Sequence, residues 1–199
     1  MAAVIVDMSR VHAFADAAGF EHWLAQHHAS EPEVWIQLHK VGSGLPSITA
    51  QEAIDVALCW GWIDAIRKSF DAHSFLQRYT PRGKRSVWSQ VNVDKVARLV
   101  AAGRMTPHGM AHVEAAQADG RWARAYVTGN AFPMPADRQA AIDADPQARA
   151  MLATLSAQNR FALAFRVHNM KTEAGRRRKI ESFVAMLQRG ETTHPQGGQ

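Results

Sequence analysis

The chain has 199 residues, of which 47% are hydrophobic and 21% are charged, a composition typical of a soluble globular protein with one sizeable core. Its apolar runs are too short to cross a bilayer, and Asp7 interrupts an N-terminal stretch that lacks the basic start of a secretory signal. The single cysteine, Cys59, excludes an internal disulfide, so a cytoplasmic protein without a membrane partner is predicted.

The net charge of +5 is distributed unevenly along the chain. Residues 67–104 hold nine lysines and arginines against two acids, a net charge of +7. Residues 160–189 hold eight against two, a net charge of +6, so the remainder carries −8. Two basic blocks indicate an anionic ligand or a nucleic acid, and they are also compatible with solvated helix faces and with arginines paired inside the fold.

The first predicted elements are a helix over residues 19–28 and a strand over residues 34–38. In the strand, apolar side chains alternate and are expected to share one buried face, namely those of Val34, Ile36 and Leu38.

A capping box of Thr49 and Glu52 opens the next predicted helix, which is alanine-rich and therefore expected to be buried. Gly61 can end this helix. Two strands are predicted after it, over residues 62–70 and 73–80, with a short turn between them.

Beyond residue 80 the pattern becomes helical. Asn92 can cap one helix, and Thr106-Pro107 is a cap followed by proline at the first helical position. Asp145-Pro146 and Ser156 can start two more helices. The last helix has an apolar stripe that must pack on a neighbour, formed by Ile180, Phe183, Val184 and Leu187.

Strands before helices indicate an α+β fold, with a small N-terminal β-sheet and its helices followed by a C-terminal helical part. We expect the α/β part over residues 1–90, the helical part packed on it over residues 91–190, and a disordered tail over residues 191–199. Residues 132–135, with two prolines, form the clearest linker within what is expected to be one compact domain.

Residues 57–64, ALCWGWID, resemble the ALCFGWID signature of the YdeI/OmpD-associated family, also called the bacteriocin-protection family. The likeness continues in residues 79–92, which resemble the segment FTPR…SxWSxxN, in residues 103–107 and 119–122, and in the pattern Arg176, Arg178, Ile180. Gly175 departs from the family, which usually has threonine before the arginine. The resemblance spans nearly the whole chain. It implies an N-terminal α/β part, a helical part and a protective role, whereas contact with a porin is not expected without an export signal.

Residues 80–92 combine the groups that a pocket for a small anionic or phosphorylated ligand requires. Arg82 can hold a phosphate or carboxylate through two hydrogen bonds, and the indole of Trp88 can stack on a ring. Ser86, Ser89 and Asn92 supply hydrogen-bonding groups before a helix N-terminus, which favours anions. In the alternative reading, Ser89 or Asn92 only caps the helix and Trp88 belongs to the core.

A second set of candidates surrounds the predicted strand over residues 62–70. If Trp62, Asp64 and Ile66 share one face, Asp64 lies beside aromatic groups and needs a cationic partner, such as Arg67 or Arg82. Asp64 would then orient a ligand, act as a general base, or close a structural salt bridge. The complete set of ligand-binding candidates is Trp60, Trp62, Asp64, Arg67, Arg82, Ser86, Trp88, Ser89, Asn92 and Arg104.

No metal or cofactor is expected. His108 and His112 have the spacing of two metal ligands on a helix, but no third ligand is evident. Cys59 lies in an apolar helix and is expected to be a core residue. The sequence has no dinucleotide, phosphate-loop or nucleophile-elbow motif.

Three functional hypotheses follow from the residues. The first is a ligand-binding or stress-protection protein that uses the Trp/Arg-lined cleft. The second is nucleic-acid binding by the two basic blocks, which requires affinity to fall steeply with salt. The third is an enzyme with Asp64 as general base, which requires a pocket around that carboxylate.

Overall fold

The computed structural model describes residues 4–127, 135–170 and 172–196, and it divides the chain into two compact units. The N-terminal unit comprises Met1–Ala125 and the helical unit comprises Tyr126–Gln199. The α+β class predicted from the sequence is confirmed, because strands β1–β4 lie in the N-terminal unit and the long elements described in the helical unit are helices.

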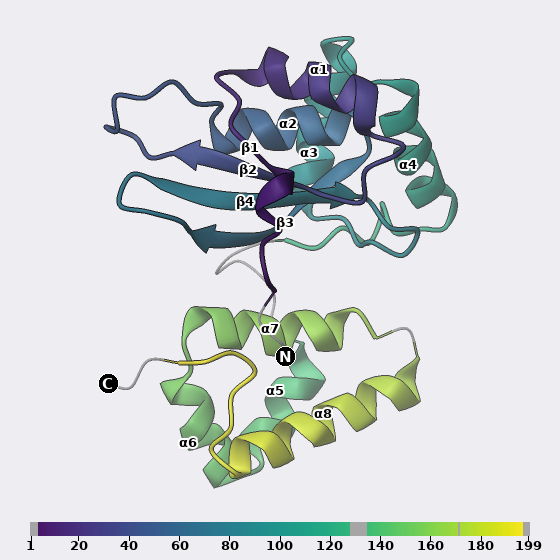
Figure 1. Cartoon of the computed structure of the whole chain (residues 1–199). Coiled ribbons are helices and arrows are strands. Elements are labelled where there is room, and N and C mark those ends of the chain that lie inside the picture. Colours follow the sequence, from purple (N-terminus) through teal and green to yellow (C-terminus); the bar gives the residue numbers. More distant parts are fainter. Residues whose placement is uncertain (1–3, 128–134, 171, 197–199) are drawn as a thin grey trace. The chain divides into compact units, whose positions relative to one another are not determined.

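Within the described residues, the N-terminal unit holds a four-stranded sheet in the order β1-β2-β4-β3 (Figure 1). β1 runs parallel to β2, and the other neighbours are antiparallel. Helices α1 and α2 lie on the same face of the sheet (Figure 1). The elements of this unit are η1 (Met8–Arg10), β1 (Val11–His12), α1 (Ala17–His27), β2 (Val34–His39), α2 (Ala50–Cys59), β3 (Trp62–Ser69), β4 (Ser74–Pro81), α3 (Gln90–Ala101) and α4 (Pro107–Ala118).

The buried face predicted for β2 is confirmed, but the opposite face is not open throughout, because Trp35 is also 0% exposed. One face of β2 packs against α1 and α2, where its apolar side chains join Phe20 and Leu24 of α1 and Val56 of α2. The residues of β2 in this core are Val34, Ile36 and Leu38. Burial of such side chains favours folding, because each fully buried aliphatic side chain contributes about 1.5–3 kcal/mol to the free energy of unfolding.

The predicted alternation of β3 is wrong beyond Asp64. A β-bulge lies between Asp64, which pairs with Tyr79, and Arg67, which pairs with Gln77. The extra residue gives Arg67 the register position expected for Ile66. Arg67 Nε donates to Gln77 Oε1 at 3.0 Å across the strands.

Helix starts follow the predicted chemistry at two of the three positions of the N-terminal unit. The capping box of Thr49 and Glu52 is present at α2, and Thr106 caps α4. The prediction that Asn92 caps α3 is wrong, because the cap is Ser89, whose hydroxyl accepts from the Asn92 amide at 3.3 Å. Serine and asparagine are comparable caps, so the sequence leaves this choice open.

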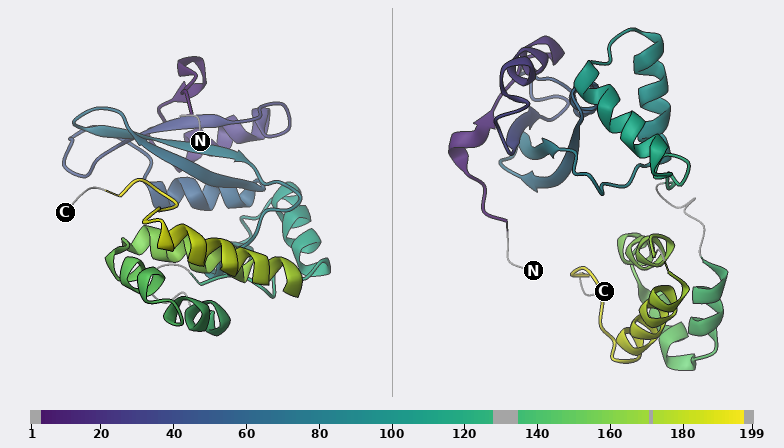
Figure 2. Two further views of the ribbon diagram at one scale, coloured as in Figure 1. Left: turned by 90° about the horizontal axis from the view of Figure 1, so that it is seen from below. Right: turned by 90° about the vertical axis from the view of Figure 1, so that its right-hand side faces the viewer.

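The described part of the helical unit consists of α5 (Ala136–Asp143), α6 (Pro146–Thr154), α7 (Ala157–His168) and α8 (Glu173–Gln188). Asp145 and Ser156 cap α6 and α7 as predicted. α7 and α8 lie side by side (Figure 2). The stripe of α8 packs into the core of this unit through Ile180, Phe183, Val184 and Leu187.

The C-terminal segment through Gln196, for which the sequence predicts disorder, is held by Asn159 of α7. The Asn159 amide is 1% exposed and donates to His194 O and to Gln196 Oε1, both at 3.2 Å. Its oxygen accepts from the His194 amide at 2.9 Å. The linker residues 132–134 lie outside the described residues.

α3 and α4 belong to the N-terminal unit, on the other side of the boundary expected near residue 90. A single compact domain over residues 1–190 stays a prediction. None of the helices described is long and apolar enough to cross a membrane.

An ion pair joins α2 to α3. Asp55 lies in α2 and is 7% exposed, and its carboxylate accepts from Lys95 Nζ at 2.7 Å and from Arg98 Nη2 at 2.6 Å. Burial alone would raise the pKa of Asp55, but the hydrogen bonds from these two cations outweigh it and hold the pKa below the ordinary 3.8. Nothing in the sequence indicates this ion pair, because Asp55 is one acid within an apolar helix.

The carbonyl of Cys59, at the end of α2, is the docking point for α4. Thr106 donates to it twice, from its hydroxyl at 2.6 Å and from its amide at 3.1 Å. Gly109 passes so close that a Cβ there would lie 2.2 Å from the carbonyl oxygen. Gly61 then turns the chain into β3 with φ of +73°.

We expect Gly109→Ala to lower the free energy of unfolding by about 3 kcal/mol, because the new methyl group overlaps a backbone carbonyl that cannot move alone. Gly19→Ala is the matched control. Both glycines donate their amide to the cap three residues earlier, but a Cβ at Gly19 meets nothing closer than 3.5 Å. The free energy of unfolding of Gly19→Ala should rise by about 0.5–1 kcal/mol, because alanine loses less conformational entropy than glycine when a helix forms. Urea unfolding followed by tryptophan fluorescence measures both, and equal effects would contradict the overlap.

Asp55→Asn should lower the free energy of unfolding by about 3–5 kcal/mol at pH 7, since it leaves Lys95 buried without its carboxylate. The folded-state pKa of Asp55 is depressed, so its contribution is fully present above pH 3.8 and is lost as the pH falls below that value. The difference in free energy of unfolding between Asp55→Asn and the unmodified chain should therefore be smaller at pH 3 than at pH 7. Urea unfolding at pH 7 and pH 3 checks this, with Asp94→Asn on exposed α3 surface as control.

Candidate functional site

The segment that the sequence singles out, residues 80–92, is built around a buried arginine–tryptophan pair. The guanidinium carbon of Arg82 lies 3.7 Å from the centre of the Trp88 ring, and Arg82 Nη1 donates to Val87 O at 3.0 Å. Arg82 is 3% exposed and Trp88 is 2% exposed. The pair is therefore part of the interior of the N-terminal unit, where a stacked guanidinium and indole stabilise each other.

Two residues that sequence reasoning missed complete this region. Trp122 meets the Trp88 ring edge-on at 4.8 Å, and Arg121 Nη1 donates to Ser86 O at 2.9 Å. The pKa of His112 is held below its ordinary value by burial and then by the charges of Arg82 and Arg121. Trp88 therefore lies beside the charge of Arg82, and Ser86 lies beside the charge of Arg121, which is outside the predicted segment.

The remaining candidates lie at several places in the N-terminal unit. Trp62 is 1% exposed, and its indole donates to His28 O at 3.3 Å. Trp60 packs on His28 and, with nearly parallel rings, on His108. Arg104 is exposed and lies 3.9 Å from a carboxylate oxygen of Glu21.

Asp64 and Arg67 do not pair with each other. Arg67 stacks over Phe75 at 4.3 Å, and Asp64 takes part in none of the ion pairs found among the described residues. Burial and the charge of Asp64 both raise the pKa of Tyr79, its cross-strand partner. The roles of all these residues in ligand binding stay predictions.

The N-terminal unit has a cleft of about 290 Å³ that sequence reasoning missed. It is formed by η1, β1, the C-terminal half of α1 and the loop before β2, so it depends on the parallel pairing of β1 with β2. Its volume is at the small end of the range for ligand pockets, about 300–1,000 Å³. The residues that line it are Ser9, Arg10, His12, Trp23, His27, Glu31 and Glu33.

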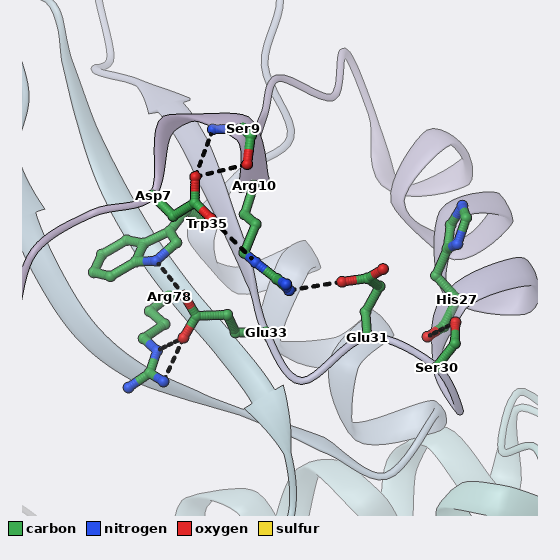
Figure 3. Close-up of polar contacts among 9 residues, drawn as sticks. All are labelled: Asp7, Ser9, Arg10, His27, Ser30, Glu31, Glu33, Trp35 and Arg78. Carbon is green, nitrogen blue, oxygen red and sulfur yellow. Dashed lines mark hydrogen bonds and ion pairs between the residues drawn. The ribbon is translucent and has the colours of Figure 1, made fainter.

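The charged groups of the cleft are paired (Figure 3). Arg10 Nη1 donates to Glu31 Oε2 at 2.7 Å, and Arg10 Nε lies 3.4 Å from Asp7 Oδ2. Glu33 is held from two sides, by Arg78 Nε at 2.6 Å and by the Trp35 indole at 3.2 Å. The side chains of Arg10 and Glu31 are 34% and 36% exposed, so this ion pair faces solvent and a ligand can reach it.

Trp23 is the aromatic wall of the cleft, between two imidazoles. Its ring centre lies 5.5 Å from that of His12 and 4.9 Å from that of His27. Burial and then the neighbouring His27 lower the pKa of His12, and Glu31 opposes this shift. His12 is therefore neutral at pH 7, and a neutral imidazole offers one donor and one acceptor.

The two basic blocks use several of their cations inside the units. In the first block, Lys95 and Arg98 hold Asp55, and Arg78 holds Glu33. In the second block, Arg176 donates two hydrogen bonds to the Asp137 carboxylate, from Nε to Oδ2 at 2.5 Å and from Nη2 to Oδ1 at 2.7 Å. These pairs reduce the charge that is free to contact phosphates, and nucleic-acid binding stays a hypothesis.

Neither a reactive thiol nor a metal cluster is found among the described residues. Burial raises the pKa of Cys59 to about 11, so its thiol stays protonated and inert at neutral pH. No group of three or more histidines, cysteines or acids in the described ranges could hold a metal ion. The His108 ring instead packs against the His28 ring at a tilt of 49°, with ring centres 4.0 Å apart.

Two family models match the chain. Residues 12–112 match the model described as a domain of unknown function (DUF8412), and this segment contains the whole sheet except the start of β1. Residues 131–190 match the model described as bacteriocin-protection, YdeI or OmpD-associated, which confirms the family likeness for this C-terminal segment. The motifs over residues 57–64 and 79–92 lie in the segment that the other model matches. Neither the curated proteins nor the solved structures contain a significant match to this chain.

Trp88→Ala should lower the free energy of unfolding by about 3–5 kcal/mol, because it removes a fully enclosed indole and leaves Arg82 without its aromatic partner. Val87→Ala changes the neighbouring residue, which is 36% exposed, and should cost less than about 0.5 kcal/mol. Chemical denaturation measures both. A stable Trp88→Ala variant would show that the indole has no structural role and would favour the recognition role predicted from the sequence.

Proposed function

We propose that this chain, which belongs to the family described as a domain of unknown function (DUF8412), is a cytoplasmic binding protein for a small polyhydroxylated molecule. The ligand occupies the cleft lined by Arg10, His12, Trp23 and Glu31. The single observation that carries this proposal is the solvent-facing Arg10–Glu31 ion pair beside an indole. A protective role, as in the description of the C-terminal family model, is the context we propose for the binding.

Charge pairing favours an uncharged ligand. A phosphate would have to compete with Glu31 for Arg10, and an ammonium group would have to compete with Arg10 for Glu31, which lie 2.7 Å apart. A hydroxyl group both donates and accepts, so vicinal hydroxyls can bridge the two partners without separating them. Hydrogen bonds to charged groups are worth about 1.5–3 kcal/mol, more than those between neutral groups.

The aromatic wall supports a ring-shaped ligand. The apolar face of a sugar or cyclitol ring can pack on Trp23, whose ring is partly buried, while the ring hydroxyls face Ser9, His12 and Glu31. Neutral His12 adds no charge to the cleft at pH 7. The small volume favours one or two sugar rings over a larger ligand.

The site predicted from the sequence, with Arg82, Trp88 and Ser89, is the competing hypothesis, and it calls for an anionic or phosphorylated ligand. A nuclear magnetic resonance titration of the ¹⁵N-labelled chain separates the two, because each tryptophan gives its own indole N–H signal. Free monosaccharides should shift the Trp23 signal. A sugar phosphate that instead shifted the Trp88 signal, with the free sugar inert, would support the competing site.

Glu31→Ala should weaken monosaccharide binding about 10- to 100-fold, because it removes the carboxylate that accepts from the ligand and frees Arg10 to rotate. The fold should be unaffected, since the Glu31 side chain is 36% exposed. Glu21→Ala, a partly exposed acid on α1 outside the cleft lining, is the control and should bind normally. If no monosaccharide or cyclitol moves the Trp23 signal at millimolar concentration, the proposed function is wrong.

A further inference from the structure

The helical unit contains a buried cation that the proposed function does not involve. Arg138 lies on α5 with a relative exposure of 0%. Ile142, one helical turn further on, belongs to the hydrophobic core of this unit. Arg138 and Ile142 are the buried residues of α5, so the arginine projects from the apolar face of the helix.

No described residue accepts a hydrogen bond from the Arg138 guanidinium. Its Nε, Nη1 and Nη2 are all enclosed and all lack a partner in the described ranges. The adjacent carboxylate, Asp137, is held by Arg176 at 2.5 and 2.7 Å. Other acids of this unit are engaged elsewhere: Asp143 with Gln139, Asp145 with the start of α6 and Gln188, and Glu191 with Arg189.

A lone guanidinium in this position is costly. Burial lowers the pKa of Arg138 to about 10, with no carboxylate acting on it, so the group remains charged at pH 7. The effective penalty for a buried ion is several kcal/mol unless an opposite charge compensates it. The N-terminal unit follows the usual solution, because buried Lys95 has Asp55 at 2.7 Å. Arg138 has no such counter-charge among the described residues.

We propose that Arg138 is the centre of a binding site for an oxyanion, the phosphate or carboxylate group of a small molecule. A guanidinium matches both groups through two parallel hydrogen bonds. The surrounding charge also favours an anion, since residues 126–199 hold ten lysines and arginines against six acids, a net charge of +4. This site is separate from the cleft in the N-terminal unit and binds a different chemical class.

The helix that carries Arg138 is the one most able to open for a ligand. α6, α7 and α8 each begin with a side-chain cap, from Asp145, Ser156 and Thr172. α5 begins at Ala136, after Pro135, which supplies no side-chain cap, and the helix is only eight residues long. In its first turn the Arg138 amide donates to Asp137 Oδ1 at 2.9 Å, but no N-cap side chain closes the turn. A short helix without an N-cap opens at lower free energy than capped neighbours, so the anion enters by local opening of α5.

The test titrates the full-length chain with inorganic phosphate and, separately, with acetate at constant ionic strength. Binding is followed by calorimetry and by the ¹⁵N signal of the arginine Nε–H groups, where an enclosed Arg138 gives a slowly exchanging peak. We expect saturable binding of one anion that shifts this peak. Binding of phosphate alone identifies a phosphorylated ligand, whereas binding of both anions identifies a general oxyanion site.

Arg138→Met should reduce the affinity at least about tenfold while leaving the far-ultraviolet circular dichroism unchanged, because an apolar side chain of similar length suits the core. Arg178→Met, on the exposed surface of α8, is the matched control and should bind as the unmodified chain does. If Arg138→Met does not fold, the Nε–H titration of the unmodified chain still decides. The proposal is overturned if neither anion moves the Arg138 peak, or if Arg138→Met binds them normally.

Discussion

The carbonyl group of Cys59 is the point on which the N-terminal unit depends. It ends α2, receives two hydrogen bonds from Thr106 and lies under Gly109, so α4 can pack only where it has no side chain. The next turn, at Gly61, starts β3 and accepts the amide of Arg82 at 2.9 Å, which ties the end of β4 to the same place. A short stretch of backbone therefore sets the positions of two helices and two strands.

This geometry explains why the most distinctive part of the sequence is structural at its centre. Residues 57–64 resemble a family signature and contain two tryptophans, a cysteine and an acid. In the structure, Cys59 and Trp62 are core residues, and Gly61 is needed for a left-handed turn pressed against His112. A motif of this kind specifies close packing between backbone segments, and side chains that bind ligands can lie far from it.

Features that depend on neighbouring residues could be predicted from the sequence. Features that depend on contacts between distant residues could not. The capping box at Thr49 and the alternation in β2 each depend on residues a few positions apart, so they are readable. The bulge after Asp64 shifts the strand register by one residue, and no Gly or Pro at this position indicates it in the sequence. The two-residue strand β1 exists because it pairs with β2, and nothing in Val11-His12 alone indicates a strand. The cleft depends on that pairing, so its residues could not be assembled from their spacing.

Charge counted along the sequence also proved a poor guide to charge available at the surface. The block over residues 67–104 has a net charge of +7, yet Arg82 is stacked on Trp88 and Lys95 is paired with Asp55, an acid that lies outside the block. Opposite charges distant in the sequence meet in the fold, as Arg10 and Glu31 do in the cleft and Arg78 and Glu33 do beside it. This pairing is the reason for proposing an uncharged ligand there. In the helical unit the balance is different, because Asp137 serves Arg176 while its neighbour Arg138 is enclosed without a described acceptor. An anionic ligand is therefore better sought at one buried arginine than across either basic block.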